Sequence, residues 1–114
     1  MESKSRLAVL WTTDNREAAL KMVFMYTKNA KKQGWFDEVR LIIWGPSAKL
    51  LTEDEELKSY FADIIGVGVD VIACKACSDY FGTSEQLEEL GVNVFYVGEE
   101  FTNILKSDYK VLTV

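Results

Sequence analysis

Hydrophobic residues in this chain of 114 residues occur in short, almost uninterrupted runs that are separated by longer stretches of mixed character. Five of these runs have the length of a β-strand and are rich in Val, Ile and Leu. They cover residues 6–12, 39–44, 69–73, 92–97 and 109–114. Because the runs barely alternate between apolar and polar positions, they indicate strands that are buried on both faces of a parallel sheet.

The stretches between the runs carry apolar residues at helical spacing, and they predict the helices of the fold. We expect a long helix from about residue 14 to Lys32, a turn of helix at 48–51, a helix from Thr52 to about residue 65, and shorter helices at 76–81, 83–90 and 98–106. Two pairs, Asp14 with Glu17 and Thr52 with Glu55, have the spacing of a capping box. They are therefore expected to mark the starts of the first two helices.

Strands and helices alternate along the chain in the order βαβαβαβαβ, which fixes the expected fold class. Alternation of this kind predicts an α/β protein with a parallel sheet and helices on both of its faces. The expected architecture is a three-layer α/β/α arrangement around a five-stranded parallel sheet. No linker, repeat or low-complexity stretch interrupts residues 1–114, so we expect a single domain.

In a sheet of this class, ligands bind beyond the carboxyl ends of the strands, and this rule selects candidate site residues without regard to their chemistry. The residues expected at that edge are Thr12, Thr13, Trp44, Gly45, Ser47, Cys74, Cys77 and Gly98. The aromatic residues Trp11, Trp44 and Tyr96 are candidates for a pocket wall or for an oligomer contact, and ordinary core packing is the competing interpretation.

The charge balance of the chain excludes several classes of partner. It has 18 acidic and 13 basic residues, for a formal net charge of −5. Nucleic acids and anionic membrane surfaces both require a cationic face, so neither is expected as a partner. The start of the chain is polar, and no apolar run approaches the roughly 20 residues that span a bilayer. We therefore expect a cytoplasmic protein without a membrane segment.

The two cysteines of the chain, Cys74 and Cys77, are spaced C-x-x-C and come directly after the third predicted strand. A thiol between a strand end and a helix start lies near unpaired N–H groups and the positive end of the helix dipole. Both favour the thiolate, which is the reactive form of cysteine. Cys74 is therefore the candidate reactive sulfur, with Cys77 as a helper or as a small apolar side chain. Lys75 would lower a thiol pKa by its charge, or would simply extend into solvent.

The C-x-x-C pair fits more than one kind of chemistry. The chain has no histidine, which removes Cys–His and Ser–His–Asp catalysis and the commonest metal ligand. Zinc needs four ligands, so a metal site would require a second subunit to supply another cysteine pair, and we expect no metal. A thioredoxin-type dithiol fits the position, although Lys75 and Ala76 replace the Gly-Pro of that family. No nucleotide-binding motif occurs, and no cofactor is expected.

Several segments, taken in their order along the chain, resemble one known family. The segments are Val71–Cys74 with Gly82 eight residues after the cysteine, Ala73-Cys74-Lys75-Ala76-Cys77, the turn 44–47, Glu88–Val94 and Lys110–Val114. In these features the sequence resembles the DsrE/DsrF-like sulfur-relay family, and its YchN-like members in particular, over essentially the whole chain.

The resemblance implies a homo-oligomer, commonly a trimer or a hexamer, and a cysteine after a central strand that carries a persulfide. Cys74 matches that position, and a protein sulfur donor and a protein acceptor would be its partners. Cys77 falls where relay subunits usually have a small residue. Three hypotheses therefore stay open: a sulfur carrier or sulfurtransferase-like protein, a C-x-x-C dithiol oxidoreductase, and a non-catalytic oligomeric module that binds a small ligand or a protein.

Overall fold

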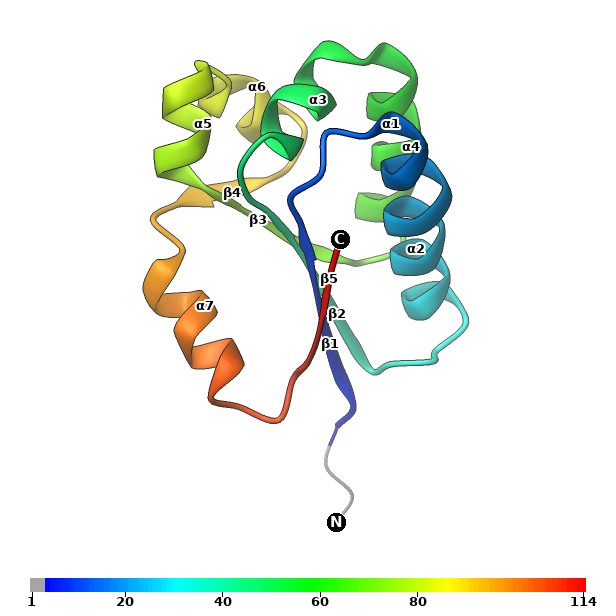
Figure 1. Cartoon of the computed structure of the whole chain (residues 1–114). Helices are drawn as coiled ribbons and strands as arrows, with labels where there is room; N and C mark the ends of the chain where they lie inside the picture. Colours follow the sequence, from blue (N-terminus) through cyan, green and yellow to red (C-terminus); the bar gives the residue numbers. More distant parts are fainter. Residues whose placement is uncertain (1–3) are drawn as a thin grey trace.

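Five parallel strands form the centre of the computed structural model, which describes residues 4–114 (Figure 1). The strands are β1 (Arg6–Trp11), β2 (Glu38–Ile43), β3 (Asp70–Cys74), β4 (Asn93–Phe95) and β5 (Lys110–Thr113). They lie side by side in the order β4-β3-β2-β1-β5, and every neighbouring pair is parallel. The predicted five-stranded parallel sheet is therefore confirmed, with a fourth and a fifth strand that are shorter than expected.

The order of the strands determines which helices cover which face. The chain adds β2, β3 and β4 in one direction from β1, and then returns to place β5 on the other side of β1. Because parallel crossovers are right-handed, the last connection must cross the face opposite to the one that the earlier connections cover. Figure 1 shows α7 (Gly98–Leu105) alone on one side of the sheet, with α2 and α4 on the other. The expected layers on both faces are present, but one of them holds a single helix of eight residues.

The remaining helices lie near the sequence-predicted positions. They are α1 (Arg16–Ala18), η1 (Ala19–Phe24), α2 (Met25–Lys32), α3 (Ser47–Glu53), α4 (Glu55–Gly66), α5 (Lys75–Phe81) and α6 (Ser84–Glu89). The first three follow one another without a break and form the long helix that was expected to end at Lys32. Its middle part, η1, has the wider π-helical turn, which the sequence did not predict.

Both predicted capping boxes are wrong, since a polar residue one or two positions further along takes the capping position in each case. Asn15 Oδ1 accepts a bond of 2.9 Å from the N–H of Ala18, and Asp54 Oδ1 accepts one of 3.0 Å from the N–H of Leu57. Thr52 is still inside α3, where its hydroxyl donates to the carbonyl of Ala48. Asp54 is the single residue between α3 and α4, and its backbone is extended, as in an N-cap. Thr52 belongs to α3 and therefore cannot cap α4.

Side chains of alternate strand residues enter two separate cores. Leu41 and Ile43 of β2 face the larger core, which is filled by α2, α4 and their neighbours, while Ile42 faces the smaller core under α7. Trp11 is fully buried in the larger core, where its ring meets Phe24 edge-on at 5.2 Å. Core packing is therefore the role of Trp11, and it forms no pocket wall. Across residues 4–114, no helix combines the length and the apolar character needed to cross a bilayer.

Candidate functional site

Cys74 is the last residue of β3 and the residue that precedes the first turn of α5. Its backbone has the extended conformation of an N-cap, with φ −69° and ψ 111°, and its side chain makes no capping bond. It pairs with Phe95 of β4, and its side chain belongs to the smaller core, together with Ile42 and Val97. Only 7% of Cys74 is exposed. The sulfur therefore lies at the carboxyl edge of the sheet, but below its surface.

Cys77 lies one turn further along α5 and is the more exposed of the two cysteines. Both residues are free thiols. Burial raises the pKa of the Cys77 thiol, and the interaction of this thiol with the neighbouring Cys74 thiol raises the pKa further. The main-chain N–H of Gly45 acts in the opposite direction on the same sulfur. The two free thiols are therefore neighbours that influence each other, and the pKa of Cys77 is raised.

The loop after β2 brings Gly45 against this pair. Gly45 has φ +78°, a left-handed conformation that glycine adopts without a steric penalty. Trp44, just before it, is half-buried and packs its ring on Phe101 of α7 at 5.4 Å. This turn lets the Gly45 N–H reach Cys77, so a main-chain group from β2 contributes to a site built on β3 and α5.

Ser47 is the first residue of α3, directly after this loop, but it is fully buried and does not line the edge. Its hydroxyl donates to the carbonyl of Trp11 at 2.6 Å and to that of Trp44 at 3.3 Å. The carbonyl of Trp11 also accepts the N–H of Trp44 at 3.1 Å. Ser47 therefore joins the loops after β1 and β2, and its role is to hold them in position.

Thr12 and Thr13, in the loop after β1, are half-buried and use their hydroxyls on the main chain. Thr12 Oγ1 donates to the carbonyl of Val114 at 3.2 Å, and the N–H of Thr12 donates to the same oxygen at 2.8 Å. Thr13 Oγ1 accepts the N–H of Asn15 at 3.0 Å. Both threonines therefore order the loop, and Thr12 also fixes the end of the chain beside β1.

Lys75 is turned away from the thiols and toward Asp79. Its Nζ lies 2.8 Å from Asp79 Oδ2 and 5.8 Å from the centre of the Tyr96 ring. The hydrogen bond with Asp79 raises the pKa of Lys75 and lowers that of Asp79. Because Asp79 takes up the lysine charge, Lys75 is positioned as a surface ion pair. Tyr96 is 68% exposed and forms no wall around the sulfurs.

A hydroxyl network between α5 and α6 was not predicted as part of the edge. Ser84 Oγ donates to Asp79 Oδ1 at 2.6 Å and shares a second bond of 2.6 Å with Ser78 Oγ. Ser78 is fully buried. The cluster of Ser, Asp and Thr at 78–84 is typical of residues that bond local main chain and turns, which is the signal that could have indicated it.

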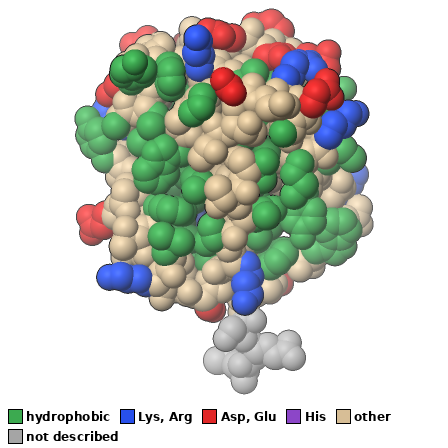
Figure 2. All heavy atoms as spheres, in the orientation of Figure 1, with side chains coloured by type: hydrophobic (Ala, Val, Ile, Leu, Met, Phe, Trp, Pro, Cys, Tyr) green, Lys and Arg blue, Asp and Glu red, His purple; other side chains and the backbone are tan. Residues whose placement is uncertain are grey.

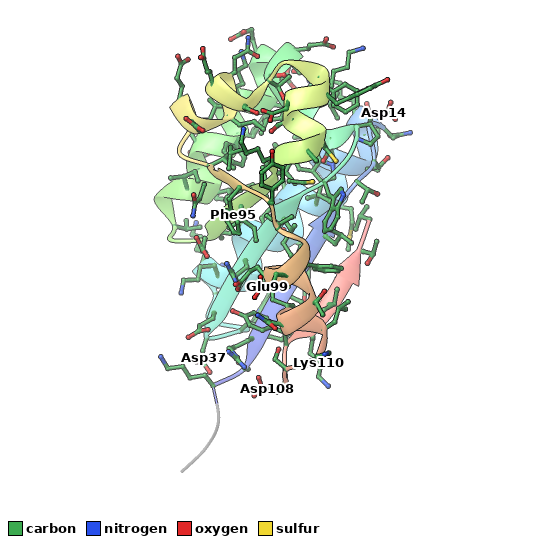
Figure 3. All side chains as sticks on the ribbon, turned by 90° about the vertical axis from the view of Figure 1, so that its left-hand side faces the viewer. Asp14, Asp37, Phe95, Glu99, Asp108 and Lys110 are labelled. Carbon is green, nitrogen blue, oxygen red and sulfur yellow. The ribbon has the colours of Figure 1, made fainter. Side chains whose placement is uncertain are left out.

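Gly98 begins α7 on the face of the sheet. Figure 3 shows the next residue, Glu99, well below the upper end of the sheet near which Asp14 lies. Phe95, at the end of β4, lies between these two levels. Of the expected edge residues, the structure therefore brings together Cys74, Cys77, Trp44 and Gly45. Within residues 4–114, no group of three or more Cys, Asp or Glu side chains is arranged to hold a metal ion.

Comparison with models of known protein families gives a match over almost the whole described chain. The model of the DsrE/DsrF-like family matches residues 6–114. Among curated proteins, none matches this chain. The features that the sequence shares with this family therefore extend over both cores and over the thiol pair.

Solved structures with the same fold come from bacteria and an archaeon. A conserved protein of unknown function from Bacteroides thetaiotaomicron, BT1422, is 34% identical, with a TM-score of 0.93 over 96% of this chain and 95% of its own. The YchN protein from E. coli is 16% identical, with a TM-score of 0.66 over 98% and 100%. MTH1491 from Methanobacterium thermoautotrophicum, also of unknown function, is 16% identical, with a TM-score of 0.73 over 96% and 99%. The last two similarities show the fold alone.

Proposed function

Because this chain belongs to the DsrE/DsrF-like family, we propose that it is a small sulfur carrier whose Cys74 holds a persulfide. The observation that carries this proposal is the pair of neighbouring free thiols at the carboxyl end of the interior strand β3. Cys74 is the N-cap residue of α5, where main-chain N–H groups without helical partners are available to a sulfur nucleophile. Cys74 is therefore proposed as the nucleophile, and Cys77 as the thiol that assists it.

The transfer consists of two displacements on the same sulfur atom. The Cys74 thiolate attacks the outer sulfur of a donor persulfide, an S–S bond forms at Cys74, and the thiolate of the donor leaves. The thiolate of an acceptor then attacks that outer sulfur, and the Cys74 thiolate leaves. No electrons are gained or lost overall. Neither step needs a metal or a cofactor.

The different exposure of the two thiols determines how a donor would approach. Cys74 is only 7% exposed, so a donor has to reach it past the more exposed Cys77 and the Gly45 loop. The Gly45 N–H, which faces Cys77, is a suitable donor for the terminal sulfur of a persulfide. We propose protein partners for both the donor and the acceptor, in a cytoplasmic thiol pool.

The assembly proposed for this carrier is a homotrimer or a homohexamer. Its support is the thin cover on the α7 side, where Leu10, Trp44 and Val111 stay only half-buried beneath a single helix. Figure 2 shows hydrophobic side chains on both sides of the exposed edge of the sheet that faces the viewer. Sedimentation equilibrium tests this assembly directly, and a mass equal to one chain at all concentrations would contradict it.

The direct test of the carrier is intact mass spectrometry after incubation with a small-molecule persulfide. The expected product has gained the mass of one sulfur atom, and it loses that mass when a thiol acceptor is added. Cys74→Ser should not be labelled, whereas Cys77→Ser should be labelled more weakly or with a shorter lifetime. Labelling that persists in Cys74→Ser, or is absent from the unaltered protein, would contradict the proposal.

A dithiol oxidoreductase is the second candidate, and the contact between Cys74 and Cys77 is the observation that favours it. In that case an external disulfide would accept two electrons from the pair, leaving a Cys74–Cys77 disulfide and two thiols on the oxidant. The product would lose the mass of two hydrogen atoms, and either serine variant would abolish it. If neither product forms, a non-catalytic binding module becomes the better explanation.

A further inference from the structure

A groove lies on the face of the sheet opposite to α7, between the long helix of η1 and α2 and the helix α4. Its volume is about 290 Å³. Leu20 and the exposed Met25 and Tyr60 form its accessible apolar lining, and the buried Phe24 and Ile64 lie beneath them. This volume is at the lower limit of small-molecule sites, which range from about 300 to 1,000 Å³. The groove is therefore suited to a small organic molecule.

Lysines dominate the charge around this groove, in a chain whose net charge is −5. Lys21, Lys28 and Lys32 line it, and Asp63 is the acidic residue beside them. Lys28 Nζ lies 3.8 Å from Asp63 Oδ2, a long and exposed ion pair. Within residues 4–114, neither Lys21 nor Lys32 forms an ion pair. The local field is therefore positive, and a ligand with a negative charge is favoured.

The lysines are not equivalent, because their spacing along the helix differs. Lys28 and Lys32 are four residues apart in α2, so they lie on the same face one turn from each other. Lys21 is more than two turns away from Lys32, a distance of about 16 Å at about 1.5 Å per residue. One small anionic group can therefore contact Lys28 and Lys32 together, while Lys21 acts only at long range.

The π-helical segment η1 supplies three of the lining residues, Leu20, Lys21 and Phe24. A π turn is wider than an α turn and occurs frequently at functional sites. Here it lies where the long helix faces α4. The unusual backbone thus coincides with the groove instead of with the thiol site.

We propose that this groove binds a small amphipathic anion, with its apolar or aromatic body against Leu20, Met25 and Tyr60 and its acidic group between Lys28 and Lys32. The acidic group is a carboxylate, sulfonate or phosphate, which ammonium groups bind as point charges. Asp63 competes with it for Lys28. The site is independent of the thiol pair, because the sheet separates the two.

The test uses 1-anilinonaphthalene-8-sulfonate, an aromatic anion, and its uncharged relative N-phenyl-1-naphthylamine, with the full chain at low salt. Fluorescence titration gives the affinity, and amide chemical shifts of labelled protein locate the probe. We expect the shifts to cluster in η1, α2 and α4. Lys32→Glu should weaken binding of the anion by about tenfold or more, since it reverses a charge in contact with the ligand.

A second variant, which is expected to change the affinity in the opposite direction, makes the test specific. Asp63→Asn removes the competing carboxylate and should tighten binding of the anion several-fold, while the uncharged probe should respond little to either variant. Lys49→Glu, on the exposed surface of α3, is the matched control and should leave the affinity within about twofold. Shifts that cluster around Cys74, equal effects of Lys32→Glu and Lys49→Glu, or weaker binding in Asp63→Asn would each overturn the proposal. A change of sedimentation coefficient in Lys32→Glu would overturn it too, in favour of a contact between two copies of the chain.

Discussion

Ser47 donates a hydrogen bond of 2.6 Å to the carbonyl oxygen of Trp11, across 36 positions of the chain. The serine is fully buried, and it comes two residues after the glycine whose N–H faces Cys77. This bond, together with the bond from the N–H of Trp44 to the same oxygen, holds the loop after β2 against the end of β1. The position of Gly45 beside the thiol pair therefore depends on a residue that has no contact with solvent.

Ser47→Ala should destabilise the protein by about 1 kcal/mol, because it removes a buried hydrogen bond. The loss is moderate, since the carbonyl of Trp11 keeps the N–H of Trp44 as a donor. Urea unfolding monitored by tryptophan fluorescence measures this effect. Ser59→Ala, on the exposed side of α4, is the matched control and should be neutral or slightly stabilising. Equal free energies of unfolding for the two variants would show that the Ser47 bond contributes nothing.

Gly45→Ala and Gly66→Ala should have opposite effects on stability. No atom lies within 4 Å of a Cβ added at either position, so packing does not distinguish them. Gly45 has φ +78°, where alanine costs roughly 1–2 kcal/mol, whereas Gly66 ends α4, where alanine gains up to about 1 kcal/mol. Thermal unfolding of both variants checks the signs. A stabilising Gly45→Ala would contradict the left-handed conformation assigned to this loop.

Cys77 should titrate at a lower pH when Cys74 is replaced by alanine. Burial is the largest cause that raises its pKa, and the neighbouring Cys74 thiol raises it further, so removal of that thiol removes the contribution of Cys74. At a given pH the variant then has more Cys77 thiolate, which is the form that reacts with iodoacetamide. The measurement is the pH dependence of the alkylation rate, followed by mass spectrometry. The midpoint of the profile, rather than the rate at one pH, separates this effect from a change in access.

Asp54 should make the stability of the protein depend on pH in the acidic range. The hydrogen bond from the Leu57 N–H has the largest effect and lowers the pKa of Asp54, and the ion pair with Arg16 at 2.7 Å lowers it further. Since the folded pKa is below the ordinary value, this carboxylate stabilises the fold above about pH 4 and loses that contribution as the pH falls through the folded pKa.

Asp54→Asn keeps the capping acceptor but cannot be titrated. We therefore expect it to be less stable than the unaltered protein at about pH 6 and to approach it at about pH 3. Urea unfolding at both pH values measures the difference. Glu53→Gln makes the same change of charge on the exposed preceding residue, and its effect at about pH 6 should be the smaller. A difference for Asp54→Asn that grows toward low pH would have the wrong sign.

Local signals in the sequence determined the elements and their class, because burial and backbone preference are encoded over a few neighbouring residues. The run Arg6–Trp11 became a central strand, and the helical spacing up to Lys32 became the first helix. The caps were assigned to the wrong residues, since Asn15 and Asp14, or Asp54 and Thr52, have similar local chemistry. The residue that caps each helix is the one whose backbone is extended at the helix start in the folded protein.

The amino-acid sequence by itself determined five strands, the alternation that makes them parallel, and the location of Cys74 between β3 and the helix that follows it, whereas the edge strands β4 and β5 are not buried as predicted. Only the tertiary structure decided that this sulfur is buried under α7, that Ser47 bonds to Trp11, and that Lys32 and Asp63 line a groove between two helices. These facts depend on contacts between residues that are far apart in the chain. Their energies come from packing and strand order, and no short pattern of residues contains that information.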